Sequence, residues 1–245
     1  KDVFDADTAA FSLASITESG MAFKTENVKA NVDFISRKGE FLSNGEESFV
    51  EFPANQYICF MDKFNWYMDN NDIEMESKRG ETVAASDFVI DIDVNKSSSN
   101  FFSIREDQDS LNFLAPTAVF NINTAIIKCE KVNFVKVADA RIYPDSGKMV
   151  IRKRALIDKL EHAGIVANDI TQYHNIYNAD VEIISRFNYK GLGFVDYIDE
   201  AEQSHQIWLK KIIVDTLFQT VAEGKIISDD DFMLSPYFEF QGEVA

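Results

Sequence analysis

The residues in this sequence that could do chemistry are two clusters of oxygen-bearing side chains. The first cluster holds Asp69, Asn71 and Asp72, and the second holds Asp229, Asp230 and Asp231. Calcium prefers hard oxygen ligands from flexible loops, so each cluster is a candidate calcium site. Neither cluster has the spacing of an EF-hand loop, and Asn and Asp are also ordinary residues of turns. Calcium is therefore the only cofactor that the sequence suggests, with plain surface turns as the alternative interpretation.

No set of catalytic or cofactor-binding residues is recognisable. The sequence has no glycine-rich phosphate loop, no HExxH or GxSxG motif and no kinase signature. Its histidines, at positions 162, 174 and 205, are too widely spaced for two of them to share a helix face as zinc ligands do, and we expect them in turns or on the surface. Cys59 and Cys129 each lie in an apolar run, which favours two packed thiols over a disulfide. We therefore expect a protein that is not an enzyme.

The composition limits the classes of partner and the kind of fold. A net charge of −17 repels nucleic-acid backbones and anionic lipid surfaces, so neither is an expected partner. No uncharged apolar run reaches the roughly 18 residues of a transmembrane helix. The many aromatic residues, with 21 Phe, and the low content of 4 Pro favour β-sheets with a substantial core.

A repeated local setting predicts how the strands are organised. Seven alanines each precede an apolar residue by one or two positions: Ala30, Ala118, Ala125, Ala140, Ala155, Ala163 and Ala179. Several of their spacings are close to multiples of 7 to 8 residues, the length of one short strand plus a tight turn. We therefore predict an all-β fold with few or no helices. Its stacked short strands would form an elongated β-solenoid or β-taco, or a β-jellyroll-like sandwich.

We expect one elongated domain over residues 1–245. The polar stretch 76–100 is a candidate weak seam, and residues 1–20 read as an irregular lead-in or a short helix. The alternation from Val28 to Phe34 predicts a strand. The segment 205–214 favours a strand with expected core positions Ile207, Leu209, Ile212 and Val214, and the alternative is an amphipathic helix that ends at Gly224. Residues 152–164 leave a helix open as an alternative to strands.

Turn chemistry predicts several chain reversals. Gly39 is expected in a turn, and Asn44-Gly45 has the residues of a type I′ hairpin. Pro144-Asp145-Ser146-Gly147 predicts a further hairpin, because proline presets φ and glycine suits the last position. Trp66 and Tyr67 could form a binding face or close the end of a core. The expected core residues are Val32, Phe34, Phe120, Ile142, Ile151, Val181, Ile183 and Phe240.

Three segments carry a family resemblance. They are VADARIYPDSGKMVIRKRALI (137–157), HAGIVANDITQYHNIYNADVEI (162–183) and FQGEV (240–244). Their short strands with small residues at the turns resemble the OstA/LptA-like envelope proteins of the β-jellyroll or β-taco type. They also resemble large uncharacterised secreted or envelope proteins of Bacteroidota. The resemblance covers residues 110–245 and, more loosely, 21–75. It implies a location in the periplasm, on the outer-membrane surface or outside the cell.

Function hypotheses of different classes follow. The first is a non-catalytic envelope or surface scaffold and binding module, part of a larger secreted protein, whose partners are other envelope proteins, further copies of the module, or glycan or lipid. The second is a β-helical enzyme acting on polysaccharides with calcium and surface carboxylates. A phage structural subunit, suggested by IWLKKIIVDTLFQTVAEGKI (207–226), and a lipid-binding groove remain further alternatives.

Overall fold

A computed structural model describes residues 2–16, 19–45, 48–79, 99–168, 174–198, 202–226, 233–235, 238–240 and 242–244. Among these residues the helical segments are three 3-10 turns, at Glu106–Gln108, Asp145–Gly147 and Lys153–Ala155. All strand pairs in the described part are antiparallel. The expected all-β class is confirmed.

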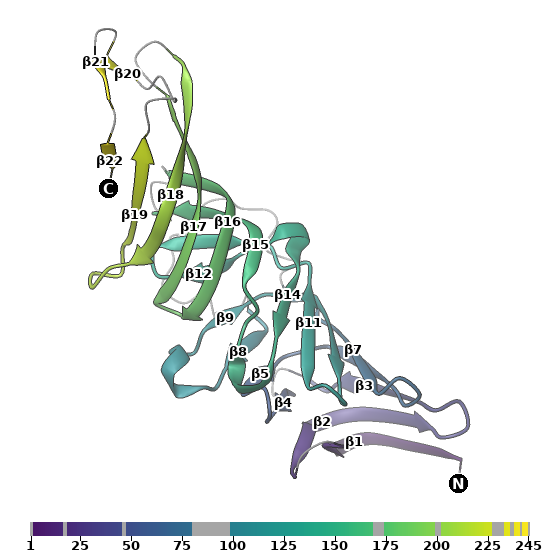
Figure 1. Ribbon diagram of the computed structural model, residues 1–245. Coiled ribbons are helices and arrows are strands. Elements are labelled where there is room, and N and C mark those ends of the chain that lie inside the picture. The colour runs from purple at the N-terminus through teal and green to yellow at the C-terminus, as the bar shows by residue number, and fades with distance from the viewer. Residues whose placement is uncertain are drawn as a thin grey trace. The chain divides into compact units, whose positions relative to one another are not determined.

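The chain forms two compact units, residues 1–133 with 146–158 and residues 134–145 with 159–245. The strands of the first unit are β1 (Val3–Ala14), β2 (Met21–Asp33), β3 (Lys38–Ser43), β4 (Val50–Phe52), β5 (Tyr57–Cys59), β6 (Lys63–Tyr67), β7 (Asp72–Glu76), β8 (Phe101–Ser103), β9 (Asn112–Phe113), β10 (Thr117–Asn121), β11 (Ile126–Glu130) and β14 (Met149–Ile151). Those of the second unit are β12 (Val135–Val137), β13 (Ala140–Tyr143), β15 (Leu160–Ala167), β16 (His174–Ser185), β17 (Asn188–Ile198), β18 (Ser204–Val214), β19 (Thr220–Ile226), β20 (Met233–Ser235), β21 (Phe238–Glu239) and β22 (Gly242–Val244) (Figure 1).

The candidate seam at 76–100 is flanked by β7 and β8, which both belong to the first unit, and residues 80–98 lie outside the described residues. A single elongated domain over residues 1–245 stays a prediction.

The sheet of the first unit curls over its own core. Its strand order is β14-β11-β10-β7-β6-β3-β2-β4-β5-β8-β9, with β1 paired to β2. Phe52 on β4 and Phe120 on β10 are separated by four strands in this order, yet their ring centroids are 4.8 Å apart and both side chains are fully buried. Phe23 on β2 contacts Phe52 and Phe64, with centroid distances of 5.8 and 5.4 Å. The curl therefore buries a cluster of phenylalanines that a flat sheet would hold apart.

The sheet of the second unit has the order β12-β13-β15-β16-β17-β18-β19-β22, and β20 pairs with β21 separately. Alternate residues of its central strands are buried, such as Val181 and Ile183 on β16. A Cβ added at Gly191 on β17 would lie 2.6 Å from the main-chain oxygen of Asp180 on β16. A Cβ at Gly193 would lie 2.8 Å from a methyl carbon of Ile176. The two glycines therefore permit the close approach of β16 and β17.

The seven alanines are all buried, and Ala163 pairs with Ala179 across β15 and β16. The alanine spacing predicted short strands of similar length, with a repeat of about 7 to 8 residues for each strand and its turn. The strands differ in length instead, and β16, β17 and β18 span 12, 11 and 11 residues. Two of the seven, Ala125 and Ala155, lie between strands with φ values of 52° and 54°. The alanines recur because small side chains fit crowded positions, both within strands and at tight reversals.

Three expectations about the N-terminal third were wrong. Residues 3–14 form strand β1, because the free edge of β2 supplies backbone partners and Phe11 packs on Phe41 at a centroid distance of 4.6 Å. Gly39 lies within β3, and the preceding turn at 34–37 uses Arg37 at φ 56°. Asn44-Gly45 makes no hairpin, because β3 and β4 both pair with the same edge of β2 rather than with each other.

The expected turn at 144–147 forms, with Ser146 and Gly147 at φ values of 52° and 63°. The expected hairpin was wrong, because β13 before it and β14 after it belong to different sheets. The helix alternative for 152–164 was also wrong, since a 3-10 turn and the start of β15 occupy this stretch.

The strand prediction for 205–214 was confirmed by β18. Three of its four expected core positions are buried, whereas Val214 is half-buried. Six of the eight other expected core residues are buried. Phe34 is 54% exposed because β2 ends one residue earlier, and Phe240 is half-buried.

Candidate functional site

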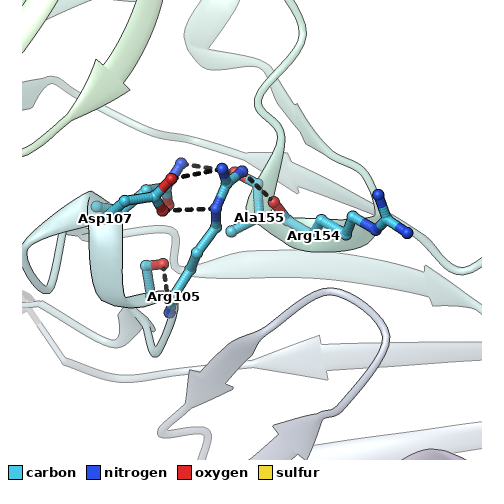
Figure 2. Close-up of polar contacts among 6 residues, drawn as sticks. Arg105, Asp107, Arg154 and Ala155 are labelled. Atoms are coloured by element: carbon cyan, nitrogen blue, oxygen red, sulfur yellow. Dashed lines mark hydrogen bonds and ion pairs between the residues drawn. The ribbon is translucent and has the colours of Figure 1, made fainter.

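A shallow depression in the first unit is lined by Gln56, Arg105, Glu106 and Asp107. The guanidinium of Arg105 donates to both oxygens of Asp107, with N–O distances of 2.6 Å, and its remaining terminal nitrogen donates to the main-chain oxygen of Arg154 at 2.8 Å (Figure 2). The 3-10 turn after Arg105 brings Asp107 back to it, since the two residues are two positions apart. Arg105 and Asp107 are thus engaged with each other and with the main chain.

Beside the depression, a network of polar groups holds one unusual turn. Arg154 and Ala155 have φ values of 58° and 54°, a backbone region that L-residues rarely adopt. Their main-chain nitrogens donate to the oxygens of residues 54 and 55 at 2.8 Å, and the buried Gln108 donates to the oxygen of Ala155 at 2.8 Å. The side-chain nitrogen of Asn55, which is fully buried, donates to the oxygens of Ala125 at 2.8 Å and Ile151 at 3.4 Å. We call Asn55, Arg105 and Gln108 the clasp. We infer that the clasp holds the turn at Arg154 and Ala155 in place against the rest of the first unit.

The first calcium candidate lies at the turn between β6 and β7. Asp69 is hydrogen-bonded to Arg37, and Asp72 accepts from the side-chain nitrogen of Asn121 at 2.7 Å. The main-chain oxygen of Asn71 accepts from Ile122 at 2.9 Å. Over the described part of the chain, no three His, Cys, Asp or Glu side chains are grouped closely enough to hold a metal. Calcium at this turn stays a prediction.

The second candidate, Asp229, Asp230 and Asp231, lies outside the described residues. Calcium at these positions likewise stays a prediction.

The thiols and the histidines have separate surroundings. Cys59 and Cys129 are free and buried, as expected, and burial raises the pKa of both thiols well above the usual value. His162 and His174 are exposed and His205 is half-buried, and all three lie in strands rather than in turns. A hydrogen bond with Asn178 raises the pKa of His162.

Trp66 and Tyr67 do not form an open platform. Trp66 is half-buried and lies 5.6 Å from Phe11 by ring centroids, and Tyr67 is half-buried beside Lys38. Trp66 therefore fits the interpretation that these residues close the end of the core, rather than the interpretation that they form a binding face.

The second unit presents a different group of aromatic residues. Tyr177 on β16 pairs in register with Phe194 on β17, which pairs with Trp208 on β18. Tyr177 and Trp208 are 36% and 48% exposed, and Phe194 is half-buried between them. The Tyr177 and Phe194 rings are 6.3 Å apart by centroid and inclined by 29°. We call these three residues the aromatic row. It lies on the sheet face opposite to the buried side chains, because its members alternate with Ile176, Ile207 and Leu209.

Polar groups fix one end of the aromatic row. The Tyr177 hydroxyl donates to the carboxylate of Asp196 at 2.6 Å and accepts from the Gln206 amide at 2.7 Å. Asp196 and Gln206 face each other across β17 and β18. The bond to Asp196 raises the pKa of Tyr177, so the phenol stays protonated and its ring is held in place. The arrangement has the features of a binding surface: exposed rings with hydrogen-bonding groups at their edge.

Sequence patterns indicate an outward position for only one member of the aromatic row. In the alternating first half of the segment 205–214, Ile207 and Leu209 are expected inside, which places Trp208 outside. The three residues are 17 and 14 positions apart, so only the strand register brings them together.

No protein-family model, curated protein or solved structure matches this chain. The resemblance to OstA/LptA-like proteins therefore stays a prediction. Among the described residues there is no helix with the length and apolar character needed to cross a membrane.

Proposed function

We propose that this chain is a non-catalytic β scaffold and binding module of the cell envelope or cell surface, and that it binds its partner through the aromatic row. The observation that carries the proposal is the register of Tyr177, Phe194 and Trp208 on the outer face of the second sheet. Exposed aromatic rings cost free energy in water, and residues such as Trp and Tyr are enriched where proteins bind partners. The envelope setting rests on the sequence resemblance, and a stacked solenoid or taco arrangement of strands rests on the resemblance and on the spacing of the seven alanines.

The interior of each sheet supports the scaffold part of this proposal. The first unit buries a cluster of phenylalanines that includes Phe52 and Phe120, and the second unit buries Ile176, Ile207 and Leu209 on the face opposite to the aromatic row. The buried inner face of the second sheet can hold the aromatic row in one geometry, which lowers the entropic cost of binding.

The test is co-sedimentation with insoluble envelope material from the cells that carry the gene. We expect the wild-type chain to pellet with this material and Trp208→Ala to stay in solution. Phe218→Ala is the matched control, because Phe218 is 55% exposed in the same unit but lies at the turn between β18 and β19. Equal pelleting of wild type and Trp208→Ala, or no pelleting at all, would overturn the proposal. Release of soluble sugar from the pellet would instead favour the polysaccharide-acting enzyme.

A further inference from the structure

We propose that the aromatic row is a site for an uncharged polysaccharide, whose sugar rings stack on Tyr177, Phe194 and Trp208. This inference rests on the proposed function and names the ligand of that same surface. The spacing of the three side chains, the hydrogen-bonding groups beside them and the local charge all favour this ligand.

The aromatic row is elongated across three strands, which suits a chain-like ligand. Its three side chains come from neighbouring strands, which lie about 4.8 Å apart, so the row extends about 10 Å across the sheet. The Tyr177 and Phe194 rings are within 29° of parallel. Aromatic faces carry negative charge density, and the C–H groups on one face of a pyranose ring are weakly positive. Aromatic side chains at this strand spacing on one face of a sheet therefore suit successive sugar units of one chain.

The edge of the row offers the polar groups that sugar hydroxyls need. The Asp196 carboxylate accepts one bond from Tyr177 and has lone pairs to spare, and the Gln206 amide keeps a second N–H and its oxygen. Both side chains are exposed. A hydroxyl group can donate to the carboxylate and accept from the amide, whereas a purely apolar ligand would satisfy neither.

The charges around the row favour a neutral ligand. Lysines pair with three nearby carboxylates: Lys159 with Asp180 at 2.8 Å, Lys190 with Glu182 at 3.0 Å, and Lys211 with Glu223 at 2.5 Å. Asp196 adds a negative charge beside the row, and Lys225 adds a positive one opposite Trp208. Because neither sign dominates, the surface is not built to attract a strongly charged polymer. The net charge of −17 further disfavours polyanions such as nucleic acid.

The experiment is affinity electrophoresis of the whole chain in native gels. The gels would contain hydroxyethylcellulose, galactomannan or dextran as uncharged polymers, or polygalacturonate as an anionic one. We expect at least one uncharged polymer to retard the wild-type chain and polygalacturonate not to do so. Trp208→Ala should weaken the apparent affinity about tenfold or more, in line with the loss of a stacking ring. Trp208→Phe should retain most of the affinity, and the Phe218→Ala control should match the wild type.

The gel experiment can support or overturn the glycan inference, provided that the variants fold. Trp208 is about half exposed, so its replacement should leave the fold intact, and an unchanged far-UV circular dichroism spectrum would verify this. Retardation by none of the uncharged polymers, by polygalacturonate alone, or equally in Trp208→Ala would overturn the glycan inference. If envelope co-sedimentation still depended on Trp208 in that case, the binding-module proposal would stand and only the ligand class would be wrong.

Discussion

Replacement of Asn55 by Ala tests whether the first sheet closes over its core as described. The Asn55 side chain has no exposed surface, and its nitrogen donates to Ala125 at 2.8 Å and to Ile151 at 3.4 Å. These acceptors lie 70 and 96 residues further along the chain. The substitution removes both bonds and leaves the two carbonyl oxygens without this donor.

The expected loss follows from the geometry. A buried polar group left without its partner costs about 1–3 kcal/mol, and the 3.4 Å bond should contribute the smaller share. The side-chain oxygen of Asn55 has no partner of its own, so its removal recovers part of that cost. We expect Asn55→Ala to lower the free energy of unfolding by about 1–3 kcal/mol. Asn55→Asp should cost more, because it loses the donor and buries a charge.

Urea unfolding followed by far-UV circular dichroism would measure both changes. Asn70→Ala is the matched control, because Asn70 is exposed and a surface substitution usually changes stability by less than about 0.5 kcal/mol. If Asn55→Ala changed stability no more than this control, the contact between the distant parts of the sheet would be refuted.

Three other predictions concern the thiols, the aromatic row and the second sheet. Cys59 and Cys129 should not react with a thiol reagent in the native chain and should react at once in urea, because burial excludes the reagent and raises the pKa of both thiols. Tyr177 should ionise above the usual pKa of about 10, because its hydroxyl donates to Asp196, so its stabilising contribution is present below pH 10 and is lost as the pH rises through the folded-state pKa. An ultraviolet pH titration that compares wild type with Tyr177→Phe would measure it. Gly191→Ala should destabilise the chain by about 1–3 kcal/mol in urea unfolding, because the added Cβ meets main-chain oxygen at 2.6 Å.

Each of these predictions has a contrary result. Rapid labelling of either thiol in the folded chain would show that the core opens. A Tyr177 phenol that titrates at or below its ordinary pKa would refute the bond to Asp196. Gly164→Ala is the control for Gly191, because its added Cβ would make only an ordinary 3.7 Å contact with Tyr143. Equal stability of the two alanine variants would contradict the close approach of β16 and β17.

The all-β class and much of the alternation within strands were predictable from the sequence. The period of two in segments such as 28–32 and 207–209 indicates that one side of an extended chain is buried, and the residues expected inside are buried there. The apolar runs around Cys59 and Cys129 correctly indicated packed thiols. These are local properties, so neighbouring residues suffice to predict them.

The pairing of the strands, and the side chains that this pairing brings together on the outer face of a sheet, became known only from the folded chain. Residues 3–14 carry little strand signal and become β1 because β2 offers an edge, while the turn at 144–147 joins two sheets because β13 and β14 find partners elsewhere. The aromatic row depends on the register of three strands, and a shift by one residue would turn its rings to the other face. Backbone hydrogen bonds are the same for every residue type, so the sequence marks where a strand lies more clearly than which strand lies beside it.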